Sequence, residues 1–134
     1  MPRFLIVDDS LFSRKVTAHL LQESLRENEI GESVVDFASD GEEALAKFNT
    51  FRPDFIFIDL LMPKLSGIEF IRAVRQKSRV GIFVVSADVQ KKSREEALEC
   101  GILDFVNKPL NDKKMVEICR KIKDEWNESG RNPV

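Results

Sequence analysis

The sequence is poor in the residues that bind metals through nitrogen or sulfur. Its 134 residues include one histidine, His19, and two cysteines, Cys100 and Cys119. These are too few for a His/Cys zinc site, and no C-x-x-C pair is present. Two isolated cysteines suit a thiol-reducing compartment. We therefore expect neither a structural zinc site nor a disulfide framework.

Long apolar runs and an excess of one charge are also missing. The N-terminal region has only Phe4–Val7 before two aspartates, far short of a signal peptide or a membrane span. Lys plus Arg number 21 and Asp plus Glu 23, so the net charge is −2. Such a balance provides no electrostatic footprint for nucleic acid or an anionic membrane. We expect a cytoplasmic protein that binds neither.

What the sequence does contain is an alternation of short apolar runs with stretches of helical periodicity. The length and the 43% hydrophobic content predict one globular domain. The apolar runs are Phe4–Val7, Val34–Ala38, Phe55–Ile58, Ile82–Val85 and Leu103–Val106. Three of the runs are apolar at every position, which is typical of parallel strands covered by helices on both faces.

Helices are predicted between and after these strands. They run from about Leu11 to Arg26, Gly41 to Phe48, Ile68 to Arg75 and Val89 to Cys100, and over a last stretch with an apolar stripe from Met115 to Trp126. Gly101 is expected to cap the fourth helix. Right-handed crossovers then give an open, doubly wound α/β sheet over residues 1–126, followed by a short polar tail at 127–134.

Polar residues stand where the predicted strands end. Asp8 and Asp9 follow the first strand and Asp59 the third, while Ser86 and Lys108 follow the fourth and fifth. In open α/β sheets these ends meet at one edge, where ligands bind. Three close carboxylates need a compensating cation, and an all-oxygen ligand set indicates Mg²⁺ or Mn²⁺.

A cation of this kind keeps waters that phosphate oxygens can replace, which indicates a phosphoryl site. The ammonium of Lys108 and the hydroxyl of Ser86 would assist phosphoryl transfer, and Asp59 is the candidate nucleophile.

The same residues belong to longer motifs. These are Val7-Asp8-Asp9-Ser10 with Arg14, Asp40-Gly41-x-x-Ala44-Leu45, Asp54-x-x-x-x-Asp59-x-x-Met62-Pro63-x-x-x-Gly67, Ser86-Ala87, and Ala97-x-x-x-Gly101 before Asp104-Phe105-x-x-Lys108-Pro109. Over about residues 4–126 the chain resembles the receiver domain of two-component response regulators, above all the stand-alone chemotaxis type. The resemblance implies a flavodoxin-like (βα)5 three-layer sandwich with a parallel sheet in the order 2-1-3-4-5.

The resemblance also implies roles for the acidic residues. Asp59 would accept a phosphoryl group from the phosphohistidine of a sensor histidine kinase or a histidine phosphotransfer protein. Asp9, Asp59 and the backbone carbonyl of Leu61 would bind Mg²⁺ directly, and Asp8 would bind it through water. Leu61 and Asp88 would flank the path of the hydrolysing water and tune the lifetime of the phosphoryl group.

Further implied roles concern the switch. Lys108 would contact a phosphoryl oxygen, and its bond to Pro109 would be cis. Ser86, with the backbone of Ala87, would bind the phosphoryl group while the Phe105 ring turns inward. A downstream protein would then bind the face formed by the fourth helix, fifth strand and fifth helix.

Two residues depart from the chemotaxis pattern. Phe105 replaces a tyrosine, so that no phenolic hydroxyl is available for a partner, and Leu60 replaces the tryptophan beside the acceptor.

The candidate residues could also have purely structural roles. Asp8-Asp9 or Ser86 could be helix caps, Lys108 a solvated loop residue, and Phe105 a core residue.

Other functions share some of these features. A Mg²⁺-dependent aspartyl-phosphate phosphatase carries D-x-D after the first strand, whereas this chain has adjacent aspartates. A flavodoxin-like electron carrier needs a phosphate-binding loop there, which two aspartates would repel. We expect no enzyme activity beyond self-phosphorylation and autodephosphorylation.

The form of the output stays open at this stage. No output domain is expected, because the sequence ends about eight residues after the last helix. A diffusible messenger, a phosphorelay intermediate and a receiver excised from a larger regulator are the alternatives, as a monomer or a phosphorylation-dependent dimer.

Overall fold

The computed structural model describes residues 1–130, and strands and helices alternate along them. The strands are β1 (Arg3–Val7), β2 (Val34–Ala38), β3 (Phe55–Ile58), β4 (Gly81–Ser86) and β5 (Asp104–Asn107). The helices are α1 (Leu11–Glu27), α2 (Gly41–Phe51), α3 (Gly67–Arg75), α4 (Lys91–Glu99) and α5 (Asp112–Glu128). Within these residues, no helix is both long and apolar enough to cross a membrane.

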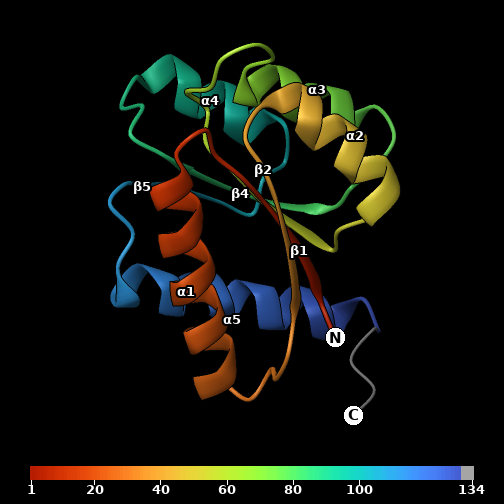
Figure 1. Cartoon of the computed structure of the whole chain (residues 1–134), viewed down its shortest axis with the longest axis vertical. Helices are drawn as coiled ribbons and strands as arrows, with labels where there is room; N and C mark the ends of the chain where they lie inside the picture. The colour runs from red at the N-terminus through yellow and green to blue at the C-terminus, as the bar shows by residue number, and fades with distance from the viewer. Residues whose placement is uncertain (131–134) are drawn as a thin grey trace.

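All strand pairs are parallel, and the sheet order is β2-β1-β3-β4-β5. Helices α1 and α5 lie on one face of the sheet and α2, α3 and α4 on the other (Figure 1). The predicted flavodoxin-like three-layer fold is therefore confirmed.

Each face of the sheet has its own core, because successive strand residues point to opposite faces. In β1, Phe4 and Ile6 pack toward α1 and α5, whereas Leu5 and Val7 pack toward the opposite helices. This two-sided burial explains why the strand sequences are apolar without alternation. The α1/α5 side holds a phenylalanine cluster in which neighbouring ring centroids lie 5.2–6.4 Å apart, and Trp126 of α5 closes it.

Helix starts follow local side-chain chemistry. Ser10, Asp40 and Asn111 accept hydrogen bonds from backbone N–H groups in the first turns of α1, α2 and α5. Ser66 and Glu69 form a capping box at the start of α3. The N-cap of α4 is Gln90, whose side chain makes no capping bond. Helix α4 is therefore the least well anchored of these helices at its N-terminus.

Several predicted boundaries were wrong by one turn or less. Helix α2 continues past Phe48 to Phe51 before Arg52 takes a left-handed conformation (φ 54°). Helix α4 begins at Lys91, not Val89, because the Asp88 carboxylate accepts the N–H of Gln90 and forms a turn there. Gly101 follows α4 with φ 71°, as its predicted role requires.

The remaining boundary differences are small. Strand β4 extends one residue further at each end than predicted, and β5 is displaced by one residue to Asp104–Asn107. Helix α5 runs to Glu128, two residues into the segment predicted as a polar tail, because hydrogen bonding continues through Ser129. The last part of that segment, 131–134, lies outside the described residues.

Candidate functional site

The predicted acidic residues lie together at the C-terminal edge of the sheet. Asp8 and Asp9 follow β1, and Asp59 follows β3. The backbone N–H of Asp8 donates to the carbonyl of Ala38, and that of Asp59 to Val7, each at 3.1 Å. These bonds extend the strand pairing by one residue and fix both side chains. One carboxylate oxygen from each aspartate lies within 4.8 Å of the others.

Lys108 joins two of these carboxylates. Its Nζ lies 2.7 Å from Asp8 Oδ2 and 2.7 Å from Asp59 Oδ2. Burial lowers the pKa of Lys108, but hydrogen bonds and charge from Asp59 and Asp8 raise it more, so that it lies above its ordinary value of 10.5. The lysine is therefore a positively charged donor at neutral pH.

The second oxygens of the buried aspartates accept other hydrogen bonds. Asp8 Oδ1 accepts the N–H of Ser10 at 2.9 Å. Asp59 Oδ1 accepts the N–H of Leu61 at 3.0 Å and the hydroxyl of Ser86 at 2.7 Å. Asp59 is thus held between an ammonium on one oxygen and a hydroxyl on the other, the two donor types that a phosphoryl group would need.

The three carboxylates fit a hard divalent cation. Asp8 and Asp59 are buried, whereas Asp9 is exposed and faces solvent. Three carboxylates outnumber the one ammonium that bridges two of them, and the cluster contains no nitrogen or sulfur ligand. Cations that prefer oxygen ligands, such as Mg²⁺, match this donor set.

Ser86 connects the acidic cluster to the loop before α4. The side chain is fully buried at the end of β4, and its Oγ also accepts the N–H of Asp88 at 3.2 Å. The Asp88 carboxylate accepts the N–H of Gln90 at 2.9 Å. Ala87 lies between them in the chain, so its backbone stands at the rim of the site. The Leu61 side chain, on the loop after β3, is 54% exposed.

Phe105 lies on β5 and is only 6% exposed. It packs with the cluster on the α2–α4 face of the sheet. The guanidinium of Arg94, on α4, lies 5.4 Å from the centre of its ring. Sequence reasoning identified Phe105 and missed Arg94, because no local pattern links a helix residue to a ring on the next strand.

The loop after β5 holds Lys108 in place. The Lys108–Pro109 peptide bond is cis. The ammonium of Lys114, on α5, donates to the carbonyls of Asn107 and Pro109 at 2.7 and 3.0 Å. No motif in the sequence indicated this clamp by Lys114, because both of its acceptors are backbone carbonyls. Arg14, present in the motif without an assigned role, donates to the carbonyl of Asp8 at 2.7 Å.

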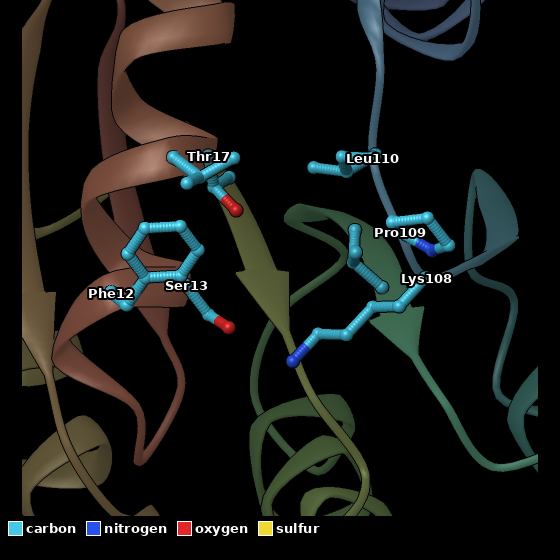
Figure 2. A pocket seen from close by; sticks show the side chains of 8 residues that line it. Phe12, Ser13, Thr17, Lys108, Pro109 and Leu110 are labelled. Carbon is cyan, nitrogen blue, oxygen red and sulfur yellow. The ribbon is translucent and has the colours of Figure 1, made fainter.

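A cavity of about 370 Å³ opens between α1 and this loop. Figure 2 shows the Lys108 side chain extending from the loop across the end of a strand, with the side chains of Phe12, Ser13 and Thr17 on the facing helix. Apolar side chains, among them Val85 and Leu110, form much of the remaining wall. The lysine therefore separates an apolar cavity from the acidic cluster.

Comparisons with known proteins bear on the family and the fold of the chain. A family model described as the response regulator receiver domain matches residues 4–120. The chain is 31% identical over 121 residues to chemotaxis protein CheY of Thermotoga maritima, covering 90% of this chain and 96% of that protein. It also superposes on the chemotaxis response regulator CheY4 of Vibrio cholerae with a TM-score of 0.76 and 30% identity, covering 91% and 98% of the two chains.

Longer relatives match in part. The chain is 36% identical over 107 residues to protein-glutamate methylesterase/protein-glutamine glutaminase 3 of Geobacter sulfurreducens, covering 80% of this chain and 28% of that protein. It spans 28–34% of the length of the first four such relatives. The match over residues 4–120 and the CheY-type fold place the chain in one family: it belongs to the response regulator receiver domains of two-component signalling.

Proposed function

We propose that this receiver domain is switched by phosphorylation of Asp59, with the phosphohistidine of a sensor histidine kinase or of a histidine phosphotransfer protein as the donor. The observation that carries the proposal is the double contact of the Asp59 carboxylate, with Lys108 on one oxygen and Ser86 on the other, each at 2.7 Å. A buried carboxylate presented between two donors beside further acidic residues is suited to forming an acyl phosphate.

In the reaction, a carboxylate oxygen of Asp59 attacks phosphorus and the phosphorus–nitrogen bond of the donor breaks. The electron pair of that bond stays on the imidazole. Asp8 orients Lys108 through their 2.7 Å hydrogen bond. The Lys108 ammonium and the Ser86 hydroxyl then donate to phosphoryl oxygens as charge develops on them. The Ala87 backbone borders the same space.

Asp9, Asp59 and the Leu61 carbonyl would hold Mg²⁺ or Mn²⁺ directly, and Asp8 would hold it through water. When bound, the ion would neutralise negative charge on the phosphoryl oxygens. The proposal is supported by the cluster of three aspartates, which offers oxygen ligands alone.

Signal output would pass through Ser86 and Phe105 to the surface of α4, β5 and α5, where a downstream protein binds. Leu61 and Asp88, which border the site, would tune the lifetime of the phosphoryl group. A diffusible chemotaxis-type messenger is favoured, since CheY of Thermotoga maritima matches along 96% of its length. A phosphorelay intermediate and a receiver within a larger regulator are the alternatives. We place the domain in residues 1–126 of a cytoplasmic protein, monomeric or dimerising on phosphorylation.

The test is incubation with radiolabelled acetyl phosphate and Mg²⁺. We expect acid-stable, base-labile label on the wild-type chain and none on Asp59→Asn. Asp36→Asn is the matched control, because Asp36 lies on β2 and pairs with Lys47 at 3.1 Å. It should take up label at the wild-type rate.

Two outcomes would contradict the proposal. Label that persists on Asp59→Asn would exclude Asp59 as the acceptor. Rapid hydrolysis of a general phosphate ester with no label on the protein would instead favour a Mg²⁺-dependent phosphatase.

A further inference from the structure

The position of Phe105 relative to Ser86 follows from the strand register. Val84 is level with Phe105, and Ser86 is level with Asn107. Residues two apart share a face of a sheet, so Phe105 and Ser86 are diagonal neighbours on the face covered by α4. The buried ring therefore occupies space beside the Ser86 hydroxyl, and an outward turn of the ring would open that space.

Arg94 is the charged residue that covers this ring. Its guanidinium lies 5.4 Å from the ring centre, within cation–π distance. Its cationic neighbours are engaged elsewhere: Lys91 with Glu95, and Lys92 with Glu96. Within residues 1–130, the ion pairs of the structure include none to Arg94. The ring is therefore the contact that orients the Arg94 head group.

Helix α4, which carries Arg94, is held unequally at its two ends. Arg75 of α3 donates from Nε to the carbonyl of Cys100 at 2.7 Å and from Nη2 to that of Gly101 at 3.1 Å. Ala97, in the C-terminal half, is the buried residue of the helix. The N-terminal half has no side-chain cap. A displacement of α4 would therefore pivot near Arg75 and move Arg94 relative to the ring.

The N-terminal end of α4 is connected to Asp59 through a series of hydrogen bonds in which side-chain oxygens accept from a hydroxyl and from backbone N–H groups. Asp59 accepts the Ser86 hydroxyl, Ser86 accepts the N–H of Asp88, and Asp88 accepts the N–H of Gln90. The Gln90 carbonyl in turn accepts the N–H of Arg94 at 3.2 Å. Any change at Asp59 that moves Ser86 reaches the helix turn from which the Arg94 side chain projects.

We propose that Arg94 is a positioning residue that holds the Phe105 ring buried and thereby favours the conformation in which Ser86 faces Asp59. The inference rests on the proposed function only where it concerns a phosphoryl group on Asp59. The contact between Arg94 and the Phe105 ring does not depend on that function. In this chain the ring has no hydroxyl, so its orientation depends on burial and on the cation above it.

The size of the effect follows from the strength of such contacts. Loss of a cation–π contact at an exposed site changes the equilibrium between ring orientations by about two- to fivefold. A phosphoryl mimic that binds only the ring-buried state loses affinity by at most the same factor.

The first experiment measures the ring without any ligand. The ten phenylalanines are replaced by fluorophenylalanine, and the Phe105 resonance is assigned with Phe105→Leu. We expect a soluble gadolinium chelate to broaden this resonance at least about twofold more in Arg94→Ala than in wild type. Arg94→Lys should remain near wild type, since it keeps a cation. Arg72→Ala is the matched control, because it removes an arginine that contacts α4 through Glu96 at 3.4 Å.

The second experiment measures beryllofluoride binding in the presence of Mg²⁺. Arg94→Ala should bind it more weakly than wild type, by up to about fivefold, and Arg72→Ala should match wild type. Equal broadening of the Phe105 resonance in wild type and Arg94→Ala would overturn the inference. Equal exposure of the ring in Arg94→Ala and Arg72→Ala would do the same. Failure of the wild-type chain to bind beryllofluoride would contradict the proposed function and leave the ring measurement to decide the role of Arg94.

Discussion

At the scale of single residues, the site depends on the charge balance around Lys108. Its removal leaves two buried carboxylates, Asp8 and Asp59, without their cation. We expect Lys108→Met to lower the free energy of unfolding at neutral pH by about 1–3 kcal/mol, the range for an unsatisfied buried polar group. Urea unfolding followed by circular dichroism measures this loss of stability.

Lys64→Met is the control, since Lys64 is exposed and its 3.5 Å pair with Asp40 lies at the surface. A loss no larger than in that control would show that the lysine does not stabilise the acidic cluster.

At the scale of elements, the start of α3 packs against the end of β3 with no room for a side chain. A Cβ on Gly67 would lie 2.5 Å from the carbonyl oxygen of Asp59 and 2.6 Å from the Cα of Leu60. We expect Gly67→Ala to lower stability by about 1–3 kcal/mol and to slow labelling by acetyl phosphate, because the displaced loop carries Asp59, the proposed acceptor. Ser66→Ala removes the helix cap without a clash, so it should cost about 1 kcal/mol and leave the labelling rate unchanged. If Gly67→Ala is destabilised but takes up label at the wild-type rate, the packing of α3 does not control the geometry of Asp59.

At the scale of the whole molecule, the proposed cation site would couple cation binding to folding. Mg²⁺ that binds the folded chain alone adds about 1.4 kcal/mol of stability at ten times its dissociation constant. We expect this to raise the melting temperature of the wild-type chain by about 3–8 °C, and excess EDTA to reverse the change. Asp9→Asn should show a smaller increase because it removes the exposed carboxylate of the cluster. Calorimetry with and without Mg²⁺ decides the matter, and an unchanged melting temperature in the wild type would argue against a cation site.

The sequence alone was enough to predict part of the fold and part of the site. Strand composition and the polar residues at strand ends were enough to predict the sheet and to expect Asp8, Asp59 and Lys108 at one edge, because parallel strands all end there. The cover of Phe105 by Arg94 and the anchoring of α4 by Arg75 were not predictable. Both depend on how one helix is placed against another element, and local periodicity carries no information about that placement.

The site is completed late in the synthesis of the chain. The hydrogen bond between Lys108 and Asp8 joins residues 100 positions apart. A nascent chain that extends just past its third strand already carries Asp8, Asp9 and Asp59, yet it lacks the ammonium of Lys108. The bridge from Lys108 to Asp8 and Asp59 therefore forms only when β5 and its following loop have joined the sheet. A chain that stops before Lys108 would therefore carry the acidic cluster without the cation that bridges Asp8 and Asp59.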